Sequence, residues 1–498
     1  MNTCGNRFWL AALLALLITG CGESGESNGS GDTDSSTGDS SGSAGGGGSA
    51  PIADPQVPPG VYFTADDGIS GYELWRSDGT SAGTTQIIDL YTGSGDSTPQ
   101  EFIDMGEELL FVARTATTGY EWFRTDGTEA GTELVIDLRP GSGSGVSFNE
   151  KTVAVVGDQV FFIGSETSSN DELWVTDGTA AGTRQVRDID GSVMTSSDPY
   201  DFAVLNDKLL FTADDGTHGK ELWISDGTES GTLMLVDIYD GGSISSRVYG
   251  LTTIGGLVYF GAQADGDDRE PWLTDGTVAG TRVIADIGPA DSDPIEWTAF
   301  DGRVFFSASD ATAGSYDSEL WATDGTSMGT VKVKELNATG QGKPLELTVF
   351  NGQLVFAAND DSGDRELWVS DGTTAGTERL VEIGTGIDGA PIDLTVVGQT
   401  LFMRATGNSM VGEQLWKTDG TAAGTVQVRQ INPSTAASLW DLTAYDDLLL
   451  FRADDGSNGR ELWVSDGTEA GTVLVKDIDT SGSGEPKNLF AVQPSPDG

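Results

Sequence analysis

Short runs of apolar residues recur along the chain with the length of β-strands. Several are continuously apolar, as in Leu209-Leu210-Phe211, Val304-Phe305-Phe306 and Leu354-Val355-Phe356-Ala357. A strand with one face in water alternates apolar and polar residues, whereas a strand covered on both faces has no need to. We therefore predict an all-β protein in which these strands are buried between neighbouring sheets.

The apolar runs belong to one module that is repeated nine times. Its marker is the motif E-L-W-x-x-D-G-T, whose Asp returns every 47 to 51 residues. The nine motif aspartates are Asp78, Asp126, Asp177, Asp226, Asp275, Asp324, Asp371, Asp419 and Asp466. A repeat of this length with four short strands in each module is typical of a β-propeller.

The four strands of a module, a to d, follow from its turn residues. Strand a, for example Leu347 to Phe350, meets strand b at Asn351-Gly352, a pair that favours a two-residue hairpin. Strand c carries the E-L-W residues, and D-G-T turns the chain into strand d. Gly accepts positive φ and Asp accepts hydrogen bonds from amides ahead of it, while the recurring Trp can pack between blades. We assign this structural role to Trp75, Asp78, Trp174, Asp177, Trp223, Asp226, Trp368, Asp371, Trp463 and Asp466.

The two ends of the repeat region predict how the ring closes. The first module begins directly at strand b, Val61 to Ala65, with no strand a before it. A segment that matches strand a, Pro486 to Val492, follows the last strand d instead. We predict a nine-bladed β-propeller over residues 61–493, with four-stranded antiparallel blades and a first blade completed by the C-terminal strand. Residues 494–498 form a tail.

The first sixty residues predict export. The apolar run from Phe8 to Ile18 is shorter than the roughly twenty residues needed to span a bilayer. The sequence Leu17-Ile18-Thr19-Gly20-Cys21 resembles the lipobox of bacterial lipoproteins. This resemblance implies a signal peptide over 1–20, lipid attachment at Cys21 and a lipid bilayer as the partner. Because the residue after Cys21 is Gly22 rather than Asp, it also implies that the protein is located at the outer membrane, on the periplasmic side or at the cell surface. An ordinary secretory signal is the alternative. Residues 21–60 are rich in Gly, Ser and Asp and predict a flexible tether.

The nine motifs resemble the bacterial E-L-W-x-x-D-G-T repeat proteins. The resemblance covers Val61 to Val492 and implies a propeller-like protein of the bacterial envelope with no agreed ligand or activity. Three modules depart from the pattern: Trp122-Phe123 replaces Leu-Trp in the second, Pro271 replaces Leu in the fifth, and Gln414 interrupts Glu-Leu in the eighth. We expect these departures to change the packing within the blades concerned but not the fold.

Charge and candidate chemistry narrow the function classes. The formal net charge of −52 argues against nucleic acid as a partner. Loops between strands b and c carry neighbouring aspartates next to glycine, the hard oxygen ligands that Ca²⁺ prefers. Ca²⁺ is therefore a candidate cofactor, with ligands Asp66, Asp67, Asp214, Asp215, Asp454 and Asp455. Alternatively, these aspartates pair with Lys220, Arg269, Arg365 and Arg460 or face water.

No residue set predicts catalysis. The sequence has one His, His218, and two Cys, so a site built on several His is excluded. The pattern favours a non-catalytic envelope lipoprotein that presents an acidic propeller as a binding scaffold for a protein or glycan. The alternatives are an enzyme that acts on polysaccharide with paired carboxylates, and a calcium-dependent adhesin.

Overall fold

The computed structural model describes residues 57–494, except 150, 169, 193, 241, 265–267, 312–316, 385 and 408–409. The predicted signal peptide, Cys21, most of the tether and residues 495–498 therefore lie outside the described residues. Within the described part, no helix is long and apolar enough to cross a membrane.

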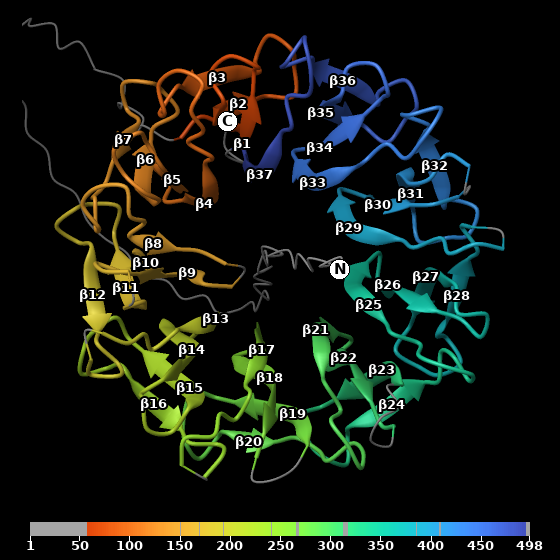
Figure 1. Cartoon of the computed structure of the whole chain (residues 1–498). Coiled ribbons are helices and arrows are strands. Elements are labelled where there is room, and N and C mark those ends of the chain that lie inside the picture. The colour runs from red at the N-terminus through yellow and green to blue at the C-terminus, as the bar shows by residue number, and fades with distance from the viewer. Residues whose placement is uncertain are drawn as a thin grey trace, which may run out of the picture. The chain divides into compact units, whose positions relative to one another are not determined.

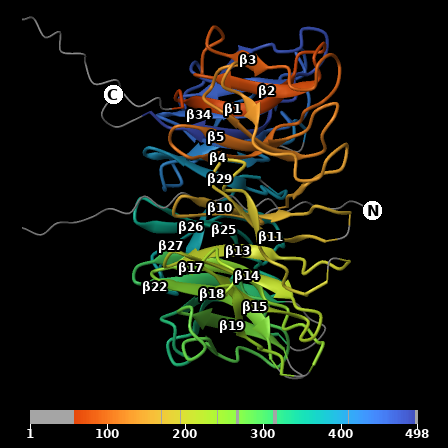
Figure 2. The same ribbon diagram turned by 90° about the vertical axis from the view of Figure 1, so that its left-hand side faces the viewer.

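The described chain forms nine antiparallel sheets arranged as the blades of a propeller (Figure 1), which confirms the predicted fold. In each blade strand a lies innermost and strand d outermost (Figure 1), and Figure 2 shows the blades from the side.

Blades 1 to 3 consist of β1 (Gly60–Asp66), β2 (Tyr72–Ser77), β3 (Thr85–Ile88) and β37 (Lys487–Val492); β4 (Gln100–Asp104), β5 (Leu109–Ala113), β6 (Glu121–Thr125) and β7 (Glu133–Leu134); and β8 (Val146–Ser147), β9 (Val153–Val156), β10 (Gln159–Gly164), β11 (Glu172–Thr176) and β12 (Arg184–Arg187). Blades 4 to 6 consist of β13 (Tyr200–Leu205), β14 (Lys208–Asp214), β15 (Lys220–Ser225) and β16 (Leu233–Val236); β17 (Tyr249–Ile254), β18 (Leu257–Gln263), β19 (Arg269–Thr274) and β20 (Arg282–Val283); and β21 (Ile295–Phe300), β22 (Arg303–Ser309), β23 (Ser318–Thr323) and β24 (Val331–Lys334). Blades 7 to 9 consist of β25 (Leu345–Phe350), β26 (Gln353–Asn359), β27 (Arg365–Ser370) and β28 (Glu378–Val381); β29 (Ile392–Val397), β30 (Thr400–Ala405), β31 (Gln414–Thr418) and β32 (Val426–Arg429); and β33 (Trp440–Tyr445), β34 (Leu448–Asp454), β35 (Arg460–Ser465) and β36 (Val473–Lys476).

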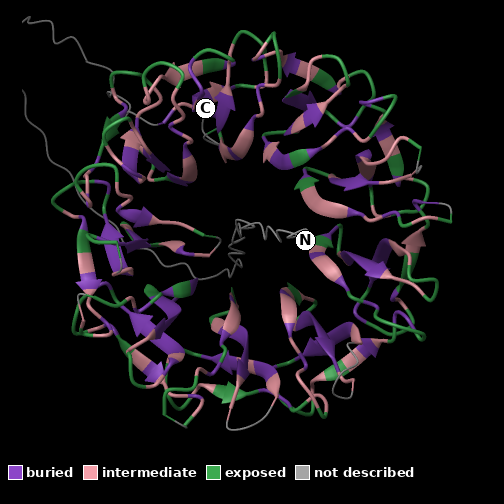
Figure 3. Cartoon of the chain, in the orientation of Figure 1, coloured by how far each residue is buried: buried purple, intermediate pink, exposed green. Residues whose placement is uncertain are grey.

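The core lies between blades, around the middle strands of each sheet (Figure 3). Between blades 3 and 4, for example, Phe161 and Leu173 of one blade pack with Phe211 and Trp223 of the next. Strand b is therefore covered on both faces, as its continuous apolar runs predict. Each blade buries its apolar faces only when both neighbours are present, which favours a closed ring.

The ring closes through the C-terminal strand. β37 pairs antiparallel with β1, with Val61 opposite Ala491 and Tyr62 opposite Phe490. The sheet of blade 1 therefore has the order β3-β2-β1-β37, and both ends of the chain contribute to one sheet. This confirms the predicted closure.

The D-G-T residues form a self-contained turn between strands c and d. In blade 4, Asp226 Oδ1 accepts hydrogen bonds from Thr228 N at 2.9 Å and Thr228 Oγ1 at 2.6 Å. Thr228 Oγ1 in turn accepts from Gly231 N at 3.0 Å. A Cβ on Gly231 would lie 2.0 Å from the Asp226 carboxylate, so glycine is required there. The turn therefore satisfies its own polar groups, which explains why it recurs unchanged.

Many of the few basic residues join neighbouring blades. Arg187 Nη1 donates to Thr232 O at 2.5 Å, and Lys476 Nζ donates to Thr84 O at 2.7 Å across the closing seam. Their charged groups also lie over the ring of the next blade's motif Trp, at 5.8 Å from Trp223 and 5.7 Å from Trp75. These contacts supplement the apolar packing between blades.

Two blades show local departures from the repeat. In blade 2 Phe123, rather than Trp122, occupies the place of the motif Trp, because Phe111 pairs with Phe123 as Phe63 pairs with Trp75. In blade 3 the inner strand is divided into β8 and β9, which pair separately with β10. The fold is the same in both cases.

Candidate functional site

The motif Glu marks a buried carboxylate in every blade except blade 8. The antiparallel strand order places the a–b and c–d turns on one side of the ring, the turn side. It places the b–c and d–a loops on the other, the loop side. Glu172 begins strand c at the loop side and is fully buried. It accepts hydrogen bonds from Ile189 N at 3.1 Å, Ser197 N at 3.1 Å and Ser197 Oγ at 2.7 Å. The motif Glu thus holds the d–a loop of its own blade.

Burial disfavours the charged form of these carboxylates. Burial is the largest cause that raises the pKa of Glu172 to about 7, and the charge of Asp190 adds to it, against hydrogen bonds that lower it. The same direction and main cause hold for Glu73, Glu121, Glu221, Glu270, Glu366 and Glu461, each with a pKa of about 7. A nearby positive charge or a bound proton would reduce the free-energy cost of keeping a carboxylate buried.

A second acidic residue accompanies the motif Glu at the end of strand d, sixteen positions later. It directly precedes the residue whose backbone N–H binds the Glu. The eight acids are Asp89, Asp137, Asp188, Asp237, Asp286, Glu335, Glu382 and Asp477. An oxygen is buried without a hydrogen-bond partner in Asp89, Asp137, Asp188 and Asp477.

Blade 8 is the exception at both positions of this acidic pair. It has Gln414 in place of the motif Glu and Gln430 in place of the second acid. Gln414 Oε1 still accepts from Ile431 N at 2.9 Å, and its amide donates to Asn432 O at 3.2 Å. The two charges are thus lost together, while the loop is still held.

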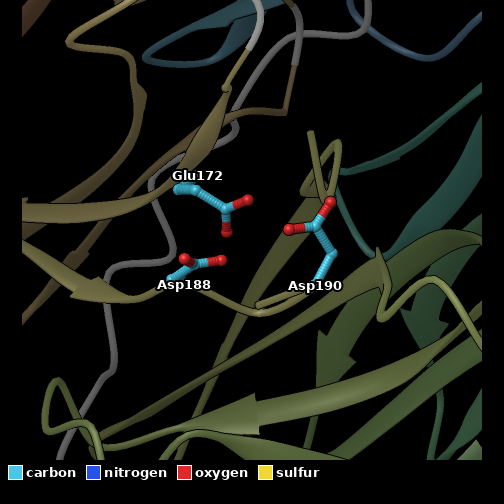
Figure 4. Close-up of side chains that lie close together, drawn as sticks. All are labelled: Glu172, Asp188 and Asp190. Carbon is cyan, nitrogen blue, oxygen red and sulfur yellow. The ribbon is translucent and has the colours of Figure 1, made fainter. Parts of the chain in front are cut away.

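The most complete acidic cluster lies in blade 3. Ligand atoms of Glu172, Asp188 and Asp190 all lie within 4.8 Å of one another, and Figure 4 shows the three carboxylates gathered around one space. No basic side chain among the described residues forms an ion pair with any of the three. Oxygen ligands of Ca²⁺ lie 2.3 to 2.6 Å from the ion, so carboxylates at this separation can share one.

Two other blades place a basic residue of their own at this position. In blade 6 Asp317, Glu319 and Glu335 form a similar cluster, and Lys332 Nζ lies 2.8 Å from Glu335 Oε2. In blade 7 Arg379 lies 2.7 Å from Asp360 and 3.7 Å from Glu382, in a pocket of about 470 Å³ that Glu366 also lines. The equivalent residue of blade 3 is the uncharged Gln185. The cluster therefore accommodates a positive charge, which blade 3 does not supply.

The six aspartates predicted as calcium ligands lie in b–c loops and bond to their own backbone. Their oxygens accept amide N–H groups two or three residues ahead, as Asp67 Oδ1 does from Ile69 N and Ser70 N. The same contacts are made by Asp66, Asp214, Asp215, Asp454 and Asp455. The structure does not bring these residues together as a three-ligand group.

The basic residues proposed as alternative partners bind elsewhere. Lys220 pairs with Asp198 at 3.6 Å, Arg269 with Asp291 at 3.0 Å, and Arg460 with Glu485 at 2.5 Å. The partners are carboxylates of the d–a segments, not of the b–c loops. The proposed pairing with the loop aspartates is therefore not formed by these three residues.

His218 lies on a b–c loop of the loop side. Its Nδ1 is 2.8 Å from Asp215 Oδ2, and 41% of its side chain is exposed. The hydrogen bond to Asp215 is the largest cause that raises the pKa of His218. The same loop position is Ser70 in blade 1 and Asn458 in blade 9, and both donate to the equivalent Asp. His218 thus has a local structural partner.

Sequence reasoning missed the acidic pair because it examined neighbouring acids within one loop. The pair comes from two strands and meets only when strand d lies beside strand c. The signal was nevertheless present, since an acid stands sixteen residues after the motif Glu in eight modules and both positions are Gln in the other.

Comparison with known proteins yields similar solved structures but no family. No protein-family model and no curated protein matches the chain. Similar solved structures include a puromycin hydrolase, with 14% identity, a TM-score of 0.38, and coverage of 76% of this chain and 61% of that one. They also include prolyl endopeptidases, with 11% identity, a TM-score of 0.41, and coverage of 73% of this chain and 56% of that one. A puromycin-hydrolyzing peptidase of Mycobacterium tuberculosis has 12% identity, a TM-score of 0.37, and coverage of 76% of this chain and 59% of that one. This chain covers less than two thirds of their length.

These neighbours correct the expectation of a non-catalytic binding scaffold. The solved structures named above are hydrolases and peptidases, and the description of this chain as non-catalytic is withdrawn. At these identities and TM-scores the likeness assigns neither a reaction nor a substrate to this chain.

Proposed function

We propose that the propeller binds divalent cations, Ca²⁺ in the first place, at the acidic pairs of its loop side. The observation that carries this proposal is the cluster of Glu172, Asp188 and Asp190 in blade 3. Its carboxylates converge within bonding reach of one ion, and Asp188 Oδ1 is buried without a hydrogen-bond partner. Three carboxylates close together repel one another unless a cation or a proton neutralises them.

Two further observations support a cation at this position. Lys332 of blade 6 and Arg379 of blade 7 each place a positive charge beside the equivalent acid. Blade 8, in which both acids are Gln, has no such charge to neutralise. Two of the eight blades with the acidic pair thus place a basic residue beside it, whereas blade 3, which has Gln185 at that position, leaves this charge to be supplied by an ion from solution.

We further propose that the chain is an exported lipoprotein, related to the E-L-W-x-x-D-G-T repeat proteins, that is anchored at the outer membrane through Cys21. The lipobox-like sequence before Cys21 and the following Gly/Ser-rich segment support this proposal. Cys21→Ser should release the protein from the membrane fraction, and a variant that still sediments with membranes would contradict the anchor.

Calcium binding is tested by calorimetric titration of the chelator-treated full chain with CaCl₂. We expect saturable binding that Asp188→Asn weakens about tenfold or more, a change of about 1.4 kcal/mol. Asp66→Asn is the matched control, because it makes the same chemical change in a loop aspartate whose oxygen already accepts Gly68 N. Equal affinity in wild type and Asp188→Asn would rule out the blade 3 site.

A further inference from the structure

Blades 8 and 9 carry an arginine where no other blade does. The position is the residue of strand b that pairs with the first residue of strand a, Arg404 opposite Ile392 and Arg452 opposite Trp440. The other seven blades have Thr64, Val112, Ile163, Thr212, Gly261, Ser307 and Ala357 at this position. Seven blades therefore form with an uncharged residue at this position, so the blade fold does not require arginine there.

Arg404 lies in a buried polar network. It is 5% exposed, and its guanidinium lies 2.6 Å from Asp393 Oδ2, 3.2 Å from Glu413 Oε1 and 2.7 Å from Leu439 O. Burying an ion pair costs desolvation energy and is often no more stabilising than apolar residues at the same place. The stability of the blade therefore does not explain this network.

Trp440 lies beside both arginines and reaches solvent. It is 39% exposed, and the guanidinium carbons of Arg404 and Arg452 lie 4.4 Å and 5.9 Å from its ring centre. Blades 6, 7 and 8 begin strand a with Ile295, Leu345 and Ile392 instead. A large aromatic side chain that stays partly exposed among polar groups is typical of a binding surface.

Trp440 is the exposed member of this group at the junction of blades 8 and 9, whereas Arg404 is buried and Arg452 is partly buried. Trp440 begins β33, one of the innermost strands of the ring (Figure 1), where the d–a loop enters strand a. The junction shares no residue with the acidic pair of blade 9, Glu461 and Asp477, and blade 8 lacks the pair. Arg452 Nη1 lies 3.3 Å from Glu485 Oε2, so both guanidinium groups are matched by carboxylates.

We propose that this junction binds a neutral glycan, with Trp440 packing against a sugar ring. The partly exposed Arg452 and Glu485 give a donor and an acceptor side by side with little net charge, which suits hydroxyl groups on the ligand. The negative charge of the whole protein disfavours an acidic polymer. The Trp ring offers an apolar face for the C–H groups of a sugar.

The test is calorimetric titration of the full chain with three neutral oligosaccharides: cellohexaose, maltohexaose and laminarihexaose. Chelator is present throughout, so that the result is independent of the cation sites. We expect at least one of them to bind with a Kd of about 1 mM or tighter. Trp440→Ile, which installs the residue that blade 8 has at this position, should weaken that binding at least about tenfold.

The matched control is Tyr200→Ile. Tyr200 begins the inner strand of blade 4 and is 42% exposed, but the residue opposite it is Thr212 rather than arginine. This variant should bind as the wild type does, and thermal unfolding should show both variants folded. Failure of all three oligosaccharides to bind, or unchanged binding by Trp440→Ile, would overturn the proposal.

Discussion

The turn side and the loop side of the ring are built from the same nine modules but satisfy their polar groups differently. On the turn side each D-G-T turn bonds its own Asp, Thr and Gly, as Asp226, Thr228 and Gly231 do in blade 4. On the loop side the buried motif Glu of eight blades is followed sixteen residues later by a second, less buried acid, and four of these second acids keep an oxygen without a hydrogen-bond partner. The repeated module thus combines a D-G-T turn, which satisfies its own hydrogen bonds, with an acidic pair whose negative charge is not balanced within the module in most blades. Four predictions test or sharpen this contrast.

The largest effect is expected in the core that both sides share. Trp223 is 3% exposed and packs between blades 3 and 4. Trp223→Ala should lower the free energy of unfolding by about 3 to 5 kcal/mol, because it leaves a cavity that the blades fill only partly. Denaturant unfolding measures the loss. Met328→Ala is the control: Met328 is 95% exposed, so its change should stay within about 0.5 kcal/mol.

The contrast itself is tested by one substitution on each side. Asp226→Ala removes the acceptor of two hydrogen bonds in a turn and should cost about 1 to 2 kcal/mol. Asp188→Asn, in chelator, should cost less, because it removes charge repulsion from a cluster without breaking a satisfied contact. Unfolding curves measure both. A loss in Asp188→Asn as large as that in Asp226→Ala would show that the two sides do not differ in this way.

The buried carboxylates predict a pH dependence of stability. Burial is the main cause that raises the pKa of Glu221 to about 7 from 4.5, so the folded state favours the protonated form. The contribution of Glu221 to the free energy of unfolding is fully present below about pH 4.5 and is lost as the pH rises through about 7. In chelator, stability should therefore fall from pH 6 to pH 8.

Glu221→Gln sharpens this test by removing one titrating group. After allowance for solvent screening, the variant should lose about 1 kcal/mol of the change in unfolding free energy between pH 6 and pH 8. Gln414 shows that an amide can hold the d–a loop at this position of blade 8. An identical pH profile for variant and wild type would mean that Glu221 does not titrate in this range.

The smallest effect is expected at His218. Its pKa is raised by the hydrogen bond to Asp215, so the contact contributes stability below about pH 6.5 and loses it as the pH rises through the raised pKa. The sequence contains one His, so NMR titration follows it directly. Asp215→Asn should return the pKa towards its ordinary value, whereas Asp67→Asn in blade 1 should leave it unchanged. A pKa insensitive to Asp215→Asn would contradict the pairing.

The fold was predictable because its determinants are local and repeated. Continuous apolar runs such as Leu209 to Phe211, the turn residues of D-G-T and the displaced strand at Pro486 to Val492 give the blades, their number and the closure. In the second module the sequence already places Trp122-Phe123 against Leu-Trp, and strand pairing sets Phe123 opposite Phe111 as Trp75 is opposite Phe63. The anchor at Cys21 stays a prediction, since it lies outside the described residues.

The candidate sites were less predictable, because their residues are distant in sequence. Asp66 and Asp67 are adjacent and suggested a calcium loop, but they bond to amides of the same loop. Glu172 and Asp188 are sixteen residues apart and meet only in the folded blade. The sequence by itself determined the nine blades, because each module carries its own strands and turns. Tertiary structure alone decided which carboxylates share a space and which arginines flank Trp440, because those contacts depend on how strands and neighbouring blades are placed.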